Sequence, residues 1–229
     1  YSLALLALVT CPATSQPNNQ PNNQPNNQPS NQPASLRSRV VLVTIDGMRP
    51  DFYLDERYPC PNLRRLCAEG SYADEVRPVF PSITYANHTS IATGVPPRQH
   101  NILSNTIFQP PASAHPGPTR AYNVESQKIK ALPLWTRAHR QNLKVTSFSW
   151  PVTVGADIDW NVPEVFHVDG VDQETTESLL RQHSTSGLWA EFDRLKLHLP
   201  TSYAEWDAWL PQAFGWVWQN KHPDLALLH

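Results

Sequence analysis

The stretch that decides the fold is RVVLVTID, residues 39–46. Its apolar, largely β-branched side chains run without the polar alternation of a half-exposed strand, which is typical of a parallel strand buried on both faces. The run ends on Asp46 and Gly47, a turn signal. Because chemistry in open α/β sheets collects at the carboxyl ends of the strands, Asp46 is the first candidate functional residue.

Helix and strand patterns alternate downstream of this strand. The sequence predicts helices over 61–70, 84–94, 132–141 and 203–221, and strands over 143–150 and 223–229. Such alternation predicts an α/β fold with helices on both faces of a mostly parallel sheet. The tryptophans between Trp206 and Trp218 are interpreted as core packing, because aromatic residues at helical spacing usually face a core.

Length and charge limit the classes of function. A chain of 229 residues with 40% apolar side chains can bury one sizeable core. Lys and Arg number 18 against 20 Asp and Glu, so net charge does not favour binding to a nucleic-acid polymer.

The first fifteen residues, YSLALLALVTCPATS, are typical of a secretory signal remnant. The apolar run from Leu3 to Val9 is far shorter than the roughly 20 residues of a membrane span. Cleavage after Ser15, with Ala13 at the −3 position, is one outcome, and lipidation of Cys11 is the other. Export to the periplasm or the extracellular space is therefore expected, with a membrane contact only through such a lipid anchor.

Residues 16–37 form a linker that repeats Gln-Pro-Asn-Asn. With no large apolar side chain in the repeat and a proline in every copy, the repeat predicts an unpacked coil with polyproline II character. It is interpreted as a spacer or as a tract without a role. The globular domain is predicted over residues 38–229.

Cys60 and Cys67 flank one predicted helix. If both were helical they would lie about 10 Å apart, too far for a disulfide. A disulfide requires that Cys60 fold back before the helix begins, and Cys67 is otherwise interpreted as a packing residue. No clustered Cys/His spacing of a structural zinc site is present in the sequence.

Thr84 is the second candidate functional residue. It opens the predicted helix TYANHTSIATG, where an N-cap role would explain a threonine as well as catalysis would. Combined with Asp46 it has a chemical meaning, because a carboxylate-held metal can withdraw the hydroxyl proton while the helix N-terminus stabilises the alkoxide.

The chain resembles the nucleotide pyrophosphatase/phosphodiesterase family of the alkaline phosphatase superfamily. The resemblance is carried by VVLVTIDGMRPDFY, TYANHTSIATG, PPRQHNILSN, PLWTRAHRQNLKVTSFSWP and HPDLALLH, in the family's order over residues 39–229. It implies an alkaline-phosphatase-like three-layer αβα sandwich. It also implies hydrolysis of phosphodiester or pyrophosphate bonds in a small phosphorylated substrate, such as a nucleotide.

The resemblance further implies site residues and cofactors. Asp46 would ligate one of two zinc ions, and Thr84 would be both metal ligand and nucleophile. Asn105 would donate to a phosphoryl oxygen, and Tyr85 would stack on a flat group of the substrate. Asn87, His88 and His100 are interpreted as structural.

The family pattern continues past His229, where its further Asp and His ligands are expected. Two side chains cannot complete a zinc site of four ligands, so the 229 residues are expected to be an N-terminal fragment that is inactive alone. The histidines 115, 139 and 167 match no ligand spacing and are expected at exposed positions.

Two alternative functions remain open from the sequence. Phosphonoacetate hydrolases have a similar threonine motif, so hydrolysis of a phosphonate is one alternative. The other is an exported module that binds phosphorylated ligands without hydrolysing them. The sequence does not indicate the oligomeric state.

Overall fold

The computed structural model describes residues 7–11, 38–109, 119–166, 175–199 and 203–229. Its main sheet has the strand order β1-β2-β7-β5-β6. These strands are β1 (Ala7–Cys11), β2 (Arg39–Val43), β5 (Val145–Phe148), β6 (Trp160–Val162) and β7 (Leu225–Leu228). β2, β7, β5 and β6 are parallel, and β1 pairs antiparallel with β2 at one edge. The predicted mostly parallel sheet is confirmed.

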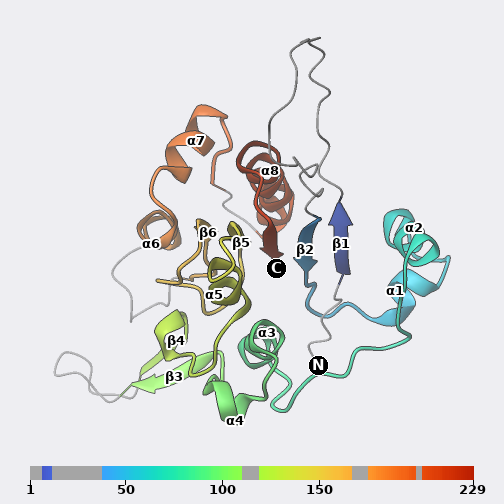
Figure 1. The fold of residues 1–229 in the computed structure, drawn as a ribbon, viewed down its shortest axis with the longest axis horizontal. Coiled ribbons are helices and arrows are strands. Elements are labelled where there is room, and N and C mark those ends of the chain that lie inside the picture. Colours follow the sequence, from blue (N-terminus) through green and yellow to red (C-terminus); the bar gives the residue numbers. More distant parts are fainter. Residues whose placement is uncertain (1–6, 12–37, 110–118, 167–174, 200–202) are drawn as a thin grey trace, which may run out of the picture.

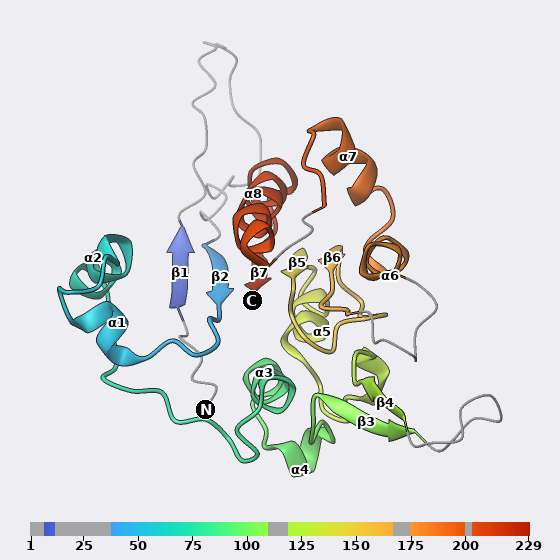
Figure 2. The ribbon, with the colours of Figure 1, turned by 180° about the vertical axis from the view of Figure 1, so that it is seen from behind.

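Helices cover both faces of this sheet (Figures 1 and 2). One face carries α6 (Thr176–His183), α7 (Leu188–Arg194) and α8 (Tyr203–Lys221), which bury Phe148 and Val162. The other face carries α3 (Thr84–Thr93) and α5 (Leu134–His139), which pack on Leu42, Val145 and Leu227. This arrangement confirms the predicted three-layer αβα architecture.

The remaining elements lie around these layers. They are α1 (Pro50–Leu54), α2 (Pro61–Glu69), α4 (Pro97–His100), the hairpin of β3 (Thr106–Gln109) with β4 (Thr119–Tyr122), and a 3-10 turn at Ser126–Lys128. The sequence patterns predicted α2 but not the hairpin, because its strands are short.

The tryptophan-rich segment packs as predicted. Helix α8 continues through Pro211. It places Trp209 in the core at 4% exposure, stacked on Trp189 with ring centroids 5.6 Å apart. These rings therefore stabilise the α6–α8 layer by burial and are not available to a ligand.

The strand register brings the carboxyl ends of the parallel strands to one edge of the sheet. Leu228 of β7 pairs with Val43 of β2 and with Phe148 of β5, and Phe148 pairs with Val162 of β6. The residues that directly follow these strands are therefore neighbours, although they are far apart in the sequence.

Both cysteines near α2 are free thiols, which answers the disulfide question that the sequence left open. Cys60 is the N-cap of α2, and Cys67 lies within the helix at a half-buried position. Residues 7–11, inside the stretch interpreted as a signal remnant, form β1. Their removal by cleavage remains a prediction, and the repeat of residues 16–37 lies outside the described residues.

Among the described residues, none of the helices combines the length and apolarity that crossing a bilayer requires.

Candidate active site

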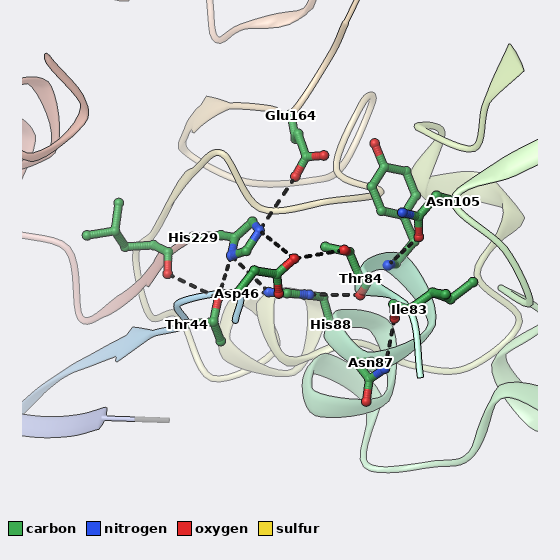
Figure 3. A network of polar contacts seen from close by, with 11 residues as sticks. Thr44, Asp46, Ile83, Thr84, Asn87, His88, Asn105, Glu164 and His229 are labelled. Carbon is green, nitrogen blue, oxygen red and sulfur yellow. Dashed lines mark hydrogen bonds and ion pairs between the residues drawn. The ribbon is translucent and has the colours of Figure 1, made fainter. Parts of the chain in front are cut away.

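The candidate site lies at the carboxyl edge of the main sheet (Figure 3). Asp46 follows β2, His229 follows β7 and Glu164 follows β6, while α3 points its first residue, Thr84, at the same edge. The sequence predicted this edge as the place for chemistry.

Thr84 and Asp46 are in direct contact. The Thr84 hydroxyl donates to Asp46 Oδ2 at 2.8 Å. Thr84 is the first residue of α3, whose N-cap is Ile83, and no side chain caps the helix. The hydroxyl donates to a carboxylate and does not serve as an N-cap, so capping does not explain this threonine.

Asn105 lies beside the start of the same helix. Its Oδ1 accepts the backbone N–H of Tyr85 at 2.9 Å. That bond fixes the amide orientation, because an N–H needs an acceptor, and leaves Nδ2 as a donor with no partner among the described residues. Asn105 can therefore offer an N–H to an oxygen bound near Thr84.

Tyr85 is buried, whereas a residue that stacks on a substrate needs an exposed ring face. Its side chain is 1% exposed and packs with Ile102 and Val152. Burial, the largest cause, raises its pKa, and the nearby Glu164 adds to this shift. A ring this enclosed offers no open face to a flat ligand in this structure, so stacking on a substrate would require the ring to move.

Two motif residues join α3 to the segments beside it. Asn87 accepts the N–H of Val79 at 2.9 Å and donates to the carbonyl of Ile83 at 2.8 Å. His100 is fully buried and contacts Ser90 Oγ at 2.9 Å. Asn87 thus holds the loop before α3, whereas His100 joins α3 to the segment that follows α4.

His88 links the backbone of Thr84 to the end of β2. Its Nδ1 lies 2.8 Å from the Thr84 carbonyl oxygen, and its Nε2 lies 2.8 Å from Thr44 Oγ1. Burial, and to a lesser extent the neighbouring His229, lowers the pKa of His88 to about 3, against the opposing hydrogen bond to Thr84. His88 is therefore neutral at ordinary pH.

His229 continues this chain of contacts. Its Nδ1 lies 3.0 Å from Thr44 Oγ1 and 3.1 Å from His88 Nε2. Burial lowers the pKa of His229, while the Asp46 charge and a hydrogen bond involving Thr44 oppose that shift. This imidazole is therefore a candidate neutral ligand.

Glu164 is a buried carboxyl group at the same edge, with 8% exposure. Burial, with the Asp46 charge adding to it and a hydrogen bond from the Tyr85 hydroxyl opposing it, raises the pKa of Glu164 to about 8. The Tyr85 hydroxyl and the Glu164 carboxyl group therefore lie close together inside the protein.

The described residues include one grouping whose spacing suits a metal ion. Ligand atoms of Asp46, His88 and His229 all lie within 4.8 Å of one another. Carboxylate oxygen and imidazole nitrogen are donors that zinc accepts, and the Thr84 hydroxyl is already on Asp46. The oxygen and nitrogen donors around Asp46 are therefore of the types that zinc accepts, although both His88 nitrogens already contact protein groups, the Thr84 carbonyl oxygen and Thr44 Oγ1.

The sequence analysis did not identify Thr44, Glu164 or His229 as site residues. Each lies at the end of a parallel strand, which was the available signal, but Glu164 follows a three-residue strand that no pattern revealed. One expectation was also wrong. His139 is not solvent-exposed, because its side chain is 22% exposed and bound between Asp157 and Asp159. His115 and His167 lie outside the described residues.

Comparison with known proteins gives the chain a family. The family model described as type I phosphodiesterase / nucleotide pyrophosphatase matches residues 40–229. Human ectonucleotide pyrophosphatase/phosphodiesterase family member 1 is 30% identical over 128 residues, which cover 55% of this chain and 14% of that protein. An uncharacterized pyrophosphatase/phosphodiesterase of Schizosaccharomyces pombe is 29% identical over 183 residues, covering 78% of this chain and 36% of that protein. The chain thus spans well under half the length of these relatives.

A solved structure shares the fold. It is the phosphonoacetate hydrolase of Sinorhizobium meliloti 1021 in complex with phosphonoacetate. The two structures match over 84% of this chain and 47% of the hydrolase chain. The TM-score is 0.54 and the sequence identity 22%. This likeness supports the predicted alkaline-phosphatase-like fold and, at this identity, nothing about the substrate.

Proposed function

Because the chain belongs to the type I phosphodiesterase / nucleotide pyrophosphatase family, we propose that it hydrolyses phosphodiester or pyrophosphate bonds with Thr84 as the nucleophile. The observation that carries this proposal is the 2.8 Å hydrogen bond from the Thr84 hydroxyl to Asp46 Oδ2 at the N-terminus of α3. A threonine hydroxyl is a poor nucleophile until its proton is withdrawn, and a metal ion held by Asp46 would withdraw it.

The metal in this proposal is zinc, held by Asp46 and Thr84, as the family resemblance implies. When bound, a zinc ion lowers the pKa of a coordinated hydroxyl and stabilises negative charge on oxygen. The resemblance implies a second zinc ion as well, and its ligands are not assigned to residues of this chain.

The protein's own groups position the phosphoryl group. Asn105 is held at the start of α3 by its Oδ1, which leaves Nδ2 as a donor near the helix N-terminus, where the helix dipole favours an anion. Thr84 Oγ1 attacks the phosphorus, and the bond to the leaving oxygen breaks with its electron pair. Water then cleaves the phosphothreonine, returning the proton to Thr84 and releasing the phosphoryl product.

The substrate class in this proposal is a small phosphorylated molecule such as a nucleotide. Relatives named for nucleotide pyrophosphatase and phosphodiesterase activity support that class. Tyr85 is kept as a substrate-side residue only if its ring becomes exposed on binding. Export is proposed from the N-terminal sequence, and the relatives named ectonucleotide or venom enzymes support it.

The test is hydrolysis by the full-length protein, purified with zinc, of bis(p-nitrophenyl) phosphate, p-nitrophenyl phosphate and phosphonoacetate. We expect turnover of the diester, reduced at least about 1,000-fold by Thr84→Ala. Thr84→Ser, which keeps a hydroxyl, should retain part of the activity.

Three outcomes would contradict the proposal. Turnover of phosphonoacetate alone would identify a phosphonate hydrolase. Binding of nucleotide without turnover of any ester would identify a binding module. Full diester turnover in Thr84→Ala would exclude this threonine as the nucleophile.

A further inference from the structure

His229 Nε2 faces two carboxyl groups without a hydrogen bond to either. Its Nε2 lies 4.0 Å from Asp46 Oδ2 and 3.9 Å from Glu164 Oε2 (Figure 3). The three side chains come from the ends of β7, β2 and β6. Whatever lies between them is therefore held by three strands of one rigid sheet.

The protonated nitrogen of His88 follows from its surroundings. The Thr84 carbonyl oxygen, 2.8 Å from His88 Nδ1, can only accept a hydrogen bond, so Nδ1 carries the hydrogen. The ring is 0% exposed, and no ion pair with a carboxylate is found for it among the described residues. A neutral ring with its hydrogen on Nδ1 leaves Nε2 as an acceptor.

The protonated nitrogen of His229 then follows from His88. His229 Nδ1 lies 3.1 Å from His88 Nε2, and two nitrogen lone pairs at that distance repel each other. His229 Nδ1 therefore carries a hydrogen, shared between His88 Nε2 and Thr44 Oγ1. In the neutral ring the lone pair is then on Nε2, which faces Asp46 and Glu164.

No proton can satisfy this lone pair across the observed gaps. A hydrogen bond needs heavy atoms within about 3.2 Å, whereas the two carboxylate oxygens lie 4.0 and 3.9 Å away. Glu164 is more than nine-tenths buried, with the Tyr85 hydroxyl beside it and its Oε2 facing His229 Nε2. A nitrogen lone pair and two carboxyl groups facing one gap are suited to a cation, whose bonds to such ligands are about 2 Å long.

We propose that Glu164 and His229, together with Asp46, bind a divalent metal ion through Glu164 Oε2, His229 Nε2 and Asp46 Oδ2. The proposal rests on the proposed function, because Asp46 is shared with the zinc assigned there. His88, although close enough by distance, is not a ligand, since its Nε2 accepts a hydrogen bond inside the protein. Mixed nitrogen and oxygen donors fit zinc, and cobalt(II) can report on the same ligands.

The test is cobalt(II) and zinc binding by the full-length protein and its Glu164→Gln and His229→Gln variants. Metal content after dialysis and the visible absorption of bound cobalt(II) are the readouts. Each variant should lose one bound equivalent or weaken affinity at least about 10-fold, since removal of even an outer-shell partner costs that much. Glu125→Gln and His139→Gln, at residues remote from this edge, should bind metal as the unmodified protein does.

The outcomes separate this proposal from the proposed function. Unchanged metal content and affinity in both variants would overturn the assignment of Glu164 and His229. If Asp46→Asn nevertheless lost the ion and Thr84→Ala lost hydrolysis, the proposed function would stand alone. An unmodified protein that bound neither metal would overturn the site altogether. Near-UV circular dichroism checks the fold, and Glu164→Asp, which keeps the charge but shortens the reach, replaces a Gln variant that fails this check.

Discussion

The two ends of the main sheet each place histidine beside aspartate, with opposite results. At the carboxyl edge, burial lowers the pKa of both His88 and His229. At the amino edge, burial also favours the neutral form of His139, but hydrogen bonds and charges from Asp157 and Asp159 outweigh it and raise the pKa. The first environment keeps imidazole neutral, as a metal ligand must be, and the second keeps it charged.

The amino-edge cluster holds the beginnings of the strands. Asp159 Oδ2 accepts the N–H of Val145 at 2.9 Å, and its Oδ1 accepts from Lys144 Nζ at 2.7 Å. Asp224 accepts the N–H of Lys144 at 2.8 Å. Both carboxylate oxygens of Asp159 thus accept hydrogen bonds inside the protein. Glu164 at the other edge lies beside the Tyr85 hydroxyl and faces His229 Nε2 at 3.9 Å.

The largest expected difference between the edges is in catalysis. Asn105→Ala removes both the support for the Tyr85 N–H and the free Nδ2 donor. We expect kcat for the diester to fall about 100-fold, which is typical of losing one donor to a transition-state oxygen. Steady-state kinetics of the full-length protein measure this.

The matched control for that variant is Asp159→Asn at the amino edge, where kcat should stay within about twofold. Equal losses in the two variants would mean that Asn105 acts only through stability.

The next effect is on stability. His88→Leu removes the side-chain hydrogen bonds to the Thr84 carbonyl and to the Thr44 hydroxyl in a fully buried site. The free energy of unfolding should fall by about 2 kcal/mol, since each hydrogen bond contributes about 1 kcal/mol. Urea unfolding with a chelator present measures it without a contribution from bound metal.

His139→Gln provides the comparison for this variant, with an expected loss of about 1 kcal/mol, because its pairs are partly exposed. A smaller loss of unfolding free energy for His88→Leu than for His139→Gln would contradict the expectation that the histidine at the carboxyl edge contributes more to stability.

The smallest effect is a pH dependence at the amino edge. The folded-state pKa of His139 is raised, so its stabilisation is complete below about pH 6.5 and is lost as the pH rises through the folded pKa. For Asp159, burial raises the pKa, but bonds from Lys144, Val145 and His139 lower it overall. Its stabilisation is present above about pH 3.9 and is lost as the pH falls through the folded pKa.

Asp159→Asn should therefore reduce the change of the free energy of unfolding with pH, on both the acid and the alkaline side, by about 1 kcal/mol. Urea unfolding at a series of pH values measures these slopes. Glu191→Gln, whose partner is Arg194, should leave the alkaline slope unchanged. An alkaline slope in Asp159→Asn equal to that of the unmodified protein would remove His139 as its origin.

Sequence patterns predicted the frame well because they depend on local rules. Residues 39–46 were predicted as a strand from continuous apolar character, and β2 lies there. The helix from Thr84 was predicted to end at Gly94, which has the left-handed φ of 73° that a glycine C-cap allows. The short hairpin β3–β4 and the short strand β6 gave too few residues for a period to be recognised.

The sequence by itself determined the α/β class, the family and the pairing of Asp46 with Thr84 as candidates, because motif order and local periodicity are written along the chain. Only the tertiary structure decided that Glu164 and His229 share one gap. Their strands lie apart in sequence, and parallel register alone sets which residues meet at an edge. It also decided the protonation of His88 and the burial of Tyr85, because desolvation depends on every element packed around a side chain.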